Sequence, residues 1–303
     1  MPNSVKLRLP ESPGYNPVSL VPLRLGRSIN HDPRSAAYPV RAAAAEPKSI
    51  TWDRHTPVLD QNTAGPDRKG LGSCTANALL GLLGCDPFWS ALPQSLQTIL
   101  SNAQQAENLA TQTYSRETQV DPFPGTYPPT DTGSDGTTAC NVAKENGWIS
   151  GFEHAFSMDA VLTALQRGPV LIGITWMSGM DRPTSEGIIK PTGYVRGGHE
   201  LLLRELDMER GLLGGDNSWS PSWGLNGRFR IAIEDFQTLL DQQGDVTAPI
   251  ALDQPAPAPQ PAPSPTAVPQ DVLDWAHRTV RTAWNSKRDH KAAQELLDWL
   301  STL

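Results

Sequence analysis

Three residue types that can together carry out nucleophilic catalysis occur in this chain in the order cysteine, histidine, asparagine. Cys74 lies in the segment LGSCTANA, where a glycine-bearing turn leads into an apolar run and predicts a helix that starts at the thiol. A helix N-terminus and a neighbouring base both favour the reactive thiolate. His199, in the segment GGHE, can be that base, and Asn217, in DNSW, can fix the angle of its ring.

The spacing of these residues agrees with one known family. His199 lies 125 residues and Asn217 lies 143 residues after Cys74, close to the roughly 130–150 residues of the papain-like pattern. NSW at 217–219, WG at 223–224 and GRF at 227–229 add a second signature. On these residues the chain resembles the papain-like cysteine peptidases over roughly residues 50–245. It looks most like their bacterial and phage branch, in particular actinobacterial phage-type members, which carry GSCT in place of GSCW.

The resemblance implies an α+β, papain-like fold. In that fold a helical half and an antiparallel, β-barrel-like half face each other across a cleft. It also implies hydrolysis of peptide bonds through an acyl-enzyme, with a polypeptide as the substrate and no cofactor. No Cys-x-x-Cys or His-Glu-x-x-His pattern points to a metal.

A further catalytic residue is implied by the resemblance. The family's oxyanion glutamine stands about six residues before the cysteine, whereas Gln61, in the matching context VLDQ, is 13 residues before Cys74. An insertion over about residues 62–69 accounts for the difference, and Asn62 is the alternative donor. Thr75 in place of tryptophan and Ser220-Pro221 in place of a glycine are departures from the pattern.

The resemblance also points to residues that contact the substrate. It places Gly133, Ser134, Asp135 and Gly136 in a wall of the cleft, where backbone groups could pair with an extended peptide. The alternative is a plain surface turn. Gly198 would let the backbone approach the cleft, and Trp219 would shield the bond between His199 and Asn217. Glu200 should point to the other face of its strand, because side chains alternate.

Composition limits the classes of function. The chain has 303 residues and a net charge of −7, and no block of Lys and Arg predicts binding to nucleic acid. No apolar run is long enough to span a membrane and the N-terminus lacks an apolar signal segment, so we expect a cytoplasmic protein, with association with a virion as an alternative. Three cysteines do not form a disulfide framework. We expect Cys85 and Cys140 to be buried thiols, although a bridge between them is the alternative.

The periodicity of apolar residues changes along the chain. Helical spacing comes first, in residues 73–84, 93–118, 137–146 and 158–167. Strand-like runs follow at 170–176, 199–206, 211–217 and 228–234, and a short helix at 234–243 closes the domain. Helices followed by strands agree with the papain-like plan.

The chain divides into four parts. We expect an extended N-terminal arm (1–49), a catalytic domain (50–247), a Pro/Ala-rich linker (248–270) and a C-terminal helical hairpin (271–303). The arm could cross the domain surface, form a loosely ordered tail, or act as a propeptide-like segment. The hairpin carries Trp275, Trp284 and Trp299, and could dock on the catalytic domain, on a second copy of the chain or on a partner protein.

The sequence therefore predicts a papain-like cysteine peptidase. Two alternatives remain. One is a peptidoglycan-cleaving cysteine endopeptidase or amidase, although no wall-binding repeat stands in the sequence. The other is a structural or scaffold protein of a phage or bacterium that keeps the papain fold, with the arm and the hairpin as docking devices.

Overall fold

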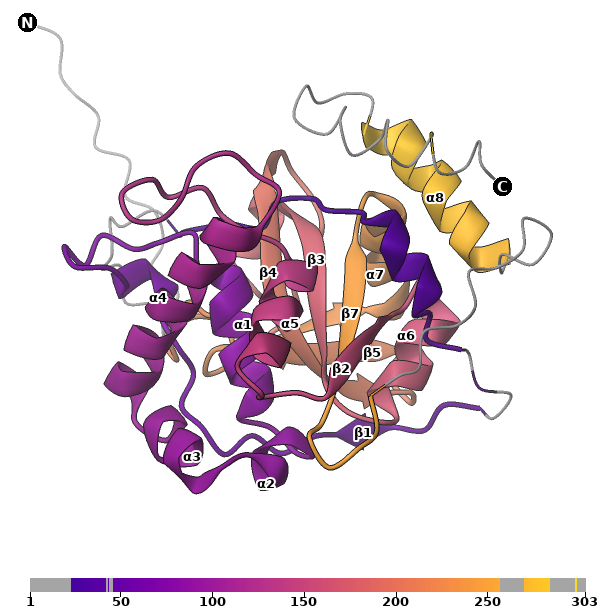
Figure 1. The fold of residues 1–303 in the computed structure, drawn as a ribbon. Helices are drawn as coiled ribbons and strands as arrows, with labels where there is room; N and C mark the ends of the chain where they lie inside the picture. Colours follow the sequence, from indigo (N-terminus) through magenta and orange to yellow (C-terminus); the bar gives the residue numbers. More distant parts are fainter. Residues whose placement is uncertain (1–22, 42, 44–45, 257–269, 284–297, 299–303) are drawn as a thin grey trace, which may run out of the picture.

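A group of helices packs against one antiparallel sheet in the computed structural model (Figure 1). The structure describes residues 23–41, 43, 46–256, 270–283 and 298. The α-helices are α1 (Cys74–Leu83), α2 (Phe88–Ala91), α3 (Gln94–Leu100), α4 (Ala103–Val120), α5 (Gly136–Glu145), α6 (Met158–Leu165), α7 (Ile233–Asp241) and α8 (Gln270–Ala283). Short 3-10 helices occur at η1 (Pro33–Ala37), η2 (Gln61–Thr63) and η3 (Ser178–Asp181).

The strands form a seven-stranded sheet. They are β1 (Ile50–Thr51), β2 (Gly151–His154), β3 (Val170–Met177), β4 (Val195–Asp207), β5 (Leu212–Asp216), β6 (Arg228–Ala232) and β7 (Asp245–Ile250). Their order is β2-β7-β3-β4-β5-β6, with β1 on β4, and all of these pairs are antiparallel. The expected combination of helices with an antiparallel sheet is confirmed.

Helix α1 lies in the middle of the molecule, between α4 and α5 on one side and β4 on the other (Figure 1). All ten of its residues are buried, which explains why its sequence is apolar almost all round. Near the C-terminal end of α1, a Cβ added at Gly81 would lie 3.5 Å from Leu202 Cδ2, an ordinary van der Waals contact, so this face of the helix lies directly on β4.

Local signals explain where the other helices begin. The Asp135 carboxylate accepts the backbone N–H of Thr138 at 2.9 Å and caps α5, and the Ser157 hydroxyl caps α6 by accepting that of Ala160. The single helix expected over 93–118 is wrong. It is broken into α3 and α4 at Asn102, whose side chain accepts the backbone N–H of Gln105 and starts the second helix.

Three strands have no counterpart in the expected elements. They are β1, which pairs with β4, and β2 and β7, which pair with each other, and β7 also pairs with β3. The expected boundary of the catalytic domain at residue 247 falls inside β7. All three strands depend on partners far away in sequence, and all three are short.

The C-terminal segment is described in part. Val272, Trp275 and Ala276 of α8 are buried against Ala36 and Phe156. Of the three docking surfaces considered for this segment, α8 therefore uses the folded domain. The second expected helix, at 289–303, and Trp284 and Trp299 lie outside the described residues apart from position 298.

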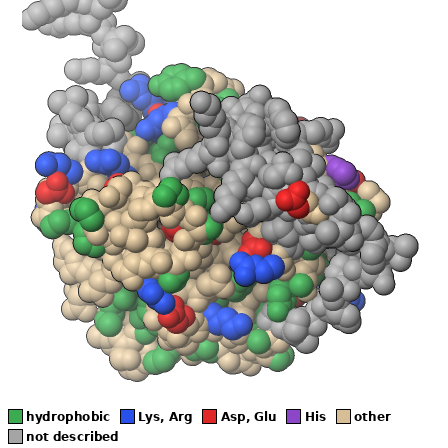
Figure 2. All heavy atoms as spheres, turned by 45° about the horizontal axis from the view of Figure 1, so that its top comes forward, with side chains coloured by type: hydrophobic (Ala, Val, Ile, Leu, Met, Phe, Trp, Pro, Cys, Tyr) green, Lys and Arg blue, Asp and Glu red, His purple; other side chains and the backbone are tan. Residues whose placement is uncertain are grey.

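Charged side chains are scattered over the part of the surface that Figure 2 shows. Lys and Arg alternate there with Asp and Glu among the described residues. Within the described part of the chain, no helix has the length and apolar character needed to cross a membrane. Cys74, Cys85 and Cys140 are all buried free thiols, so the alternative of a bridge between Cys85 and Cys140 is wrong here.

Candidate functional site

Cys74 is the first residue of α1, and its side chain is fully buried. The residue before it, Ser73, makes no capping bond with its side chain and donates its hydroxyl to Asn77 Oδ1 at 2.8 Å. The helix therefore begins without a side-chain cap, and its first N–H groups favour negative charge at this end. A thiolate or an oxyanion beside Cys74 would benefit from this position.

Hydrogen bonds from two side chains hold the turn that leads into Cys74. Asp131 accepts the backbone N–H of Gly72, with both carboxylate oxygens at 3.0 Å, and the hydroxyl of Tyr114 at 2.6 Å. The same Tyr114 hydroxyl accepts the backbone N–H of Gly133 at 2.8 Å. The turn at Gly72 and the glycine-rich segment at 133–136 are thus tied together at one edge of the helical half.

His199 and Asn217 meet on neighbouring strands at the sheet side. His199 Nε2 lies 2.8 Å from Asn217 Oδ1, and the backbone N–H of Ser218 donates to the same oxygen at 2.7 Å. Because an N–H already points at Oδ1, this atom is an acceptor, and Nε2 must carry the imidazole proton. His199 Nδ1, which has no partner, is then the basic nitrogen.

Aromatic rings enclose this pair. Trp219 stacks on His199 with 4.8 Å between ring centroids, and the edge of Trp176 approaches the same ring at 5.0 Å. Trp219 and Trp176 are 2% and 0% exposed. This geometry agrees with the shielding of the His199–Asn217 bond that is expected of Trp219.

Burial favours the neutral forms of the Cys74 thiol and the His199 imidazole in this structure. It raises the pKa of the Cys74 thiol well above its ordinary value, and the carboxylate of Glu200 adds to the effect. It also lowers the pKa of His199 to about 4, although the bond from Asn217 opposes this shift. The expected thiolate–imidazolium pair is therefore disfavoured while the site is closed to water.

Gln61, in η2, lies next to the segment that carries Asn217. Its Oε1 accepts the hydroxyl of Ser218 at 2.6 Å, and its backbone N–H donates to the Ser218 carbonyl at 2.9 Å. Its Nε2 donates to two carbonyls, those of Leu71 at 3.0 Å and Arg24 at 3.1 Å. The structure thus brings the Gln61 amide to the Asn217–Ser218 segment, despite the longer spacing from Cys74.

The N-terminal arm occupies the space between the two halves, where it is seen as the indigo segment along the upper edge in Figure 1. On the sheet side, Gly198 O accepts the backbone N–H groups of Gly26 and Arg27 at 3.3 and 3.1 Å. On the helical side, Ser134 N–H donates to Gly26 O at 2.9 Å, and Ser28 N–H donates to Ser134 O at 2.6 Å. The arm is bound through its backbone on both sides.

Further contacts place the arm beside the candidate catalytic residues. The carbonyl of Arg24 accepts the indole N–H of Trp219 at 2.9 Å as well as the amide of Gln61. Gly26 is packed so tightly on the turn before Cys74 that an added Cβ would lie 1.9 Å from the carbonyl oxygen of Gly72. Asn62, the alternative oxyanion donor, accepts the backbone N–H of Arg24 at 2.7 Å.

Residues 23–41 therefore form an extended arm, but residues 23–28 run between the two halves rather than over the domain surface. Gly133, Ser134, Gly198 and Trp219, all named as substrate-contact residues, contact this arm. Asp135 instead caps α5, and Gly136 packs against Glu200. Three residues to which the sequence assigned no role in the site meet at the same place: Arg27 and Glu200, which are buried, and Asp245, whose side chain is 16% exposed.

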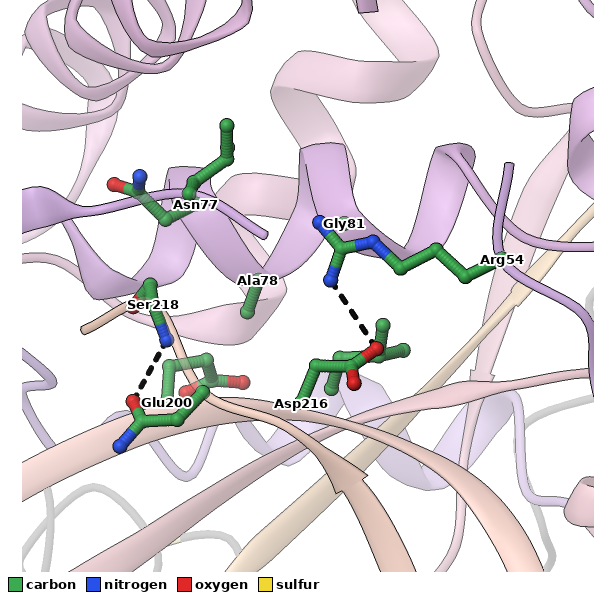
Figure 3. A pocket seen from close by; sticks show the side chains of 10 residues that line it. Arg54, Asn77, Ala78, Gly81, Glu200, Asp216 and Ser218 are labelled. Atoms are coloured by element: carbon green, nitrogen blue, oxygen red, sulfur yellow. Dashed lines mark hydrogen bonds and ion pairs between the residues drawn. The ribbon is translucent and has the colours of Figure 1, made fainter. Parts of the chain in front are cut away.

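An ion-pair network supports the end of β5 beneath Asn217. Asp216 pairs with Arg204 at 2.7 Å. It also pairs with Arg54 at 3.1 Å, as Figure 3 shows. Burial alone would raise the pKa of Asp216, but the two guanidinium groups hold it below its ordinary value. Figure 3 shows Asn77 and Ala78 of α1 across a small cavity from Asp216 and Glu200. Its volume of about 10 Å³ leaves room for one water molecule.

Solved structures share this architecture. Xylellain, a cysteine protease from Xylella fastidiosa, superposes with a TM-score of 0.51 over 82% of this chain and 99% of its own, at 16% identity. A ragweed pollen cysteine protease in its proform covers 80% of this chain and 69% of its own, at 18% identity and a TM-score of 0.47. Procathepsin L 3 from the larval midgut of Tenebrio molitor covers 76% of each chain, at 14% identity and a TM-score of 0.47.

The chain thus has the fold of the papain-like cysteine proteases. No protein-family model matches its sequence, and no curated protein does. Among the described residues, no group of three or more His, Cys, Asp or Glu side chains is arranged to hold a metal ion.

Proposed function

We propose that the protein is a cysteine peptidase that uses Cys74, His199 and Asn217, with Gln61 as the oxyanion donor. The observation that carries this proposal is a stretch of polypeptide, residues 24–28, held through its backbone beside His199 and the turn before Cys74. A site that binds extended backbone on both sides is suited to a peptide substrate. The GSCT motif supports kinship with the bacterial and phage branch, and three free buried thiols support a reducing compartment.

The orientation of His199 suits the proton transfers of such a reaction. Because Nε2–H is engaged by Asn217, Nδ1 is left to take the proton of the Cys74 thiol. The sulfur then attacks the peptide carbonyl, and the imidazolium returns the proton to the leaving amine. Water, deprotonated by the same nitrogen, releases the acyl group as a carboxylate and regenerates the thiol.

The Gln61 amide would stabilise the negative charge that develops on the carbonyl oxygen. One such donor is worth roughly 10²–10³ in rate. In the closed structure this amide is bound by the Arg24 carbonyl, so a substrate must displace the arm before it can use the same donor. Displacement of the arm would also let water reach Cys74 and His199, which reduces the burial that favours their neutral forms.

Hydrolysis of a peptide library by the wild-type chain and by Cys74→Ala tests the proposal. We expect cleavage by the wild type, none above background by the variant, and the same melting temperature for both. Equal hydrolysis by both would remove Cys74 from the mechanism. A folded wild-type protein that binds peptides without cleaving them would instead support the scaffold alternative.

A further inference from the structure

One side chain of the arm enters the protein interior beside the cleft. The guanidinium of Arg27 is fully buried and pairs with Asp245 at 2.6 Å, and the same Nη2 atom donates to the Gln243 carbonyl at 2.9 Å. The backbone N–H of Arg27 is held by Gly198, the residue before His199. An arginine is thus held in a pocket while its backbone lies in the cleft.

The pocket is shaped by two glycines. A Cβ at Gly173 would lie 2.4 Å from Asp245 Oδ1, 2.5 Å from Arg27 Nε and 2.9 Å from Glu200 Oε2. A Cβ at Gly136 would lie 2.5 Å from Glu200 Oε1. Any larger residue at either position would fill the space that these side chains occupy. The absence of side chains at both positions is therefore what makes room for a guanidinium between the carboxylates.

The carboxylates of the pocket need a cation. Glu200 is fully buried, and neither of its carboxylate oxygens has a hydrogen-bond partner. Burial first, and then the charge of Asp245, raise the pKa of Glu200, while Arg27 opposes them. Asp135 adds a further buried acid. A buried carboxyl without a counter-charge stays protonated, so a guanidinium that enters the pocket favours the ionised form of Glu200 and can pair with it.

Arginine suits this arrangement better than lysine does. Its planar guanidinium presents five N–H donors in a fixed fork. Nη2 donates to Asp245 and to the Gln243 carbonyl. Nε lies 2.5 Å from the point where Gly173 would carry a Cβ, and Glu200 Oε2 lies 2.9 Å from the same point. Nε and Nη1 are unpaired, as are both oxygens of Glu200, so donors and acceptors remain available on the two sides of the pocket.

We propose that the pocket formed by Glu200, Asp245 and Asp135 is a specificity pocket that selects an arginine side chain of the substrate, and that Arg27 of the arm occupies it until a substrate replaces it. This inference rests on the proposed peptidase function. It follows from the position of the pocket, because Gly198 accepts the backbone N–H of Arg27 and Ser134 bonds to the residues on either side of it, and Glu200 directly follows His199. The substrate class is therefore arginine-containing peptide.

The test uses pairs of fluorogenic peptides that differ only by arginine or citrulline, its uncharged isostere, at one position at a time. The enzyme is the full chain with Arg27→Ala, which empties the pocket and removes the ion pair that helps to hold the arm against a competing substrate. We expect kcat/KM for the arginine peptide to exceed that for the matched citrulline peptide by at least about 30-fold at one position, because the free energy of a buried charge pair corresponds to a ratio of this size. Glu200→Gln in the same background should reduce this ratio at least about tenfold, and a melting curve checks that the variant is folded.

A second measurement decides the case in which turnover is slow. A thiol-directed epoxide probe labels Cys74, and the arginine peptide should slow this labelling more than the matched citrulline peptide does. Equal cleavage of the two peptides, or equal protection of Cys74 by them, would overturn the arginine pocket and leave the peptidase function standing. A chain whose Cys74 is not labelled and which cleaves no peptide would refute the proposed function, and the pocket proposal with it.

Discussion

The hydrogen bond between His199 and Asn217 determines which imidazole nitrogen is basic. Asn217 Oδ1 accepts from His199 and from the backbone of Ser218, and Trp219 covers the ring face. The ring is therefore held in one tautomer and at one angle before any substrate arrives. In the proposed reaction, such an arrangement affects the transition state, in which His199 would move a proton, more than it affects the binding of a peptide.

Replacement of Asn217 should reveal this role. We expect Asn217→Ala to lower kcat by on the order of 10² while KM changes little, because the lost contact orients the base in the transition state. Steady-state kinetics on one peptide measure both constants. A rise in KM at constant kcat would show that Asn217 contacts the substrate instead.

Gln61 and Asn62 both reach the arm, but through different groups. Gln61 offers an N–H donor to the Arg24 carbonyl, whereas Asn62 offers an acceptor to the Arg24 backbone N–H. Only a donor can stabilise an oxyanion. We therefore expect Gln61→Ala to cost about 10²-fold or more in kcat, and Asn62→Ala to leave kcat near the wild-type value. A larger loss of kcat in Asn62→Ala than in Gln61→Ala would instead make Asn62 the oxyanion donor.

The individual catalytic candidates could be predicted from the sequence, because local motifs and chain spacing mark them. The acidic pocket could not be predicted in this way. The alternation of side chains along β4 does put Glu200 on the face opposite to His199, but the contacts on that face come from Gly136, Gly173 and Arg27, which are far away in the chain. A glutamate beside the base in an otherwise apolar strand was the one signal that pointed there.

The arm is held by more than its backbone. His31 is 3% exposed, lies edge-on to Trp275 at 5.2 Å and has no hydrogen-bond partner on either ring nitrogen. Burial, with Arg27 and His154 adding to it, lowers the pKa of His31 to about 3, and burial lowers that of His154 to about 4. Both rings are thus neutral where the arm, β2 and α8 meet.

These shifts predict a loss of stability in acid. The unfolded chain takes up protons below its ordinary histidine pKa of about 6.5, while the folded chain does not until about pH 3–4. The free energy of unfolding should therefore fall as the pH drops from 7 towards 4. His31→Phe should remove the contribution of His31 to this loss of unfolding free energy, which is about 1–3 kcal/mol at pH 4.5.

Melting curves between pH 7.5 and 4.5 measure this effect, with the exposed His277 replaced by Phe as the control. The account expects His31→Phe to be less sensitive to acid than the wild type, and His277→Phe to follow the wild type. Identical profiles for His31→Phe and the wild type would show that His31 does not contribute to the loss.

The sequence predicts the helices more reliably than the strands and the N-terminal arm, because the signals that start a helix are local. The caps Asp135 and Ser157 are local, so α5 and α6 end within two residues of their expected bounds. The strand pair β2–β7 and the arm depend on partners that are far away in sequence, such as the bond from Ser28 to Ser134. Local periodicity does not record such contacts, which is why the arm was expected on the surface.

At the scale of the whole molecule, the arm and α8 belong to one packed unit. Ala36 from the arm and Phe156, which follows β2, form a small apolar cluster with Val272, Trp275 and Ala276. Arg278 also pairs with Asp241 at the end of α7, at 3.2 Å. The C-terminal segment therefore stabilises the part of the arm that leads into the cleft.

A chain that ends at Leu252 should retain its fold and hydrolyse small peptides, because Cys74, His199, Asn217 and Gln61 all precede this point. Loss of α8 exposes Phe156 and Ala36, so we expect a melting temperature lower by about 5–10 °C. Trp275→Ala in the full-length chain is the matched variant and should shift the melting temperature in the same direction. Loss of all hydrolysis in a folded, shortened chain would show that α8 is part of the catalytic unit.

The central claim is that Cys74 is a nucleophile whose cleft is occupied by the arm. Labelling of the full-length chain with an epoxide-type thiol-protease probe, followed by intact mass and peptide mapping, tests it most directly. We expect one adduct per chain on Cys74 and none on Cys85 or Cys140, with faster labelling in Arg27→Ala than in the wild type and very little in His199→Ala. No adduct in either the wild type or Arg27→Ala, or labelling of Cys74 that does not depend on His199, would contradict it.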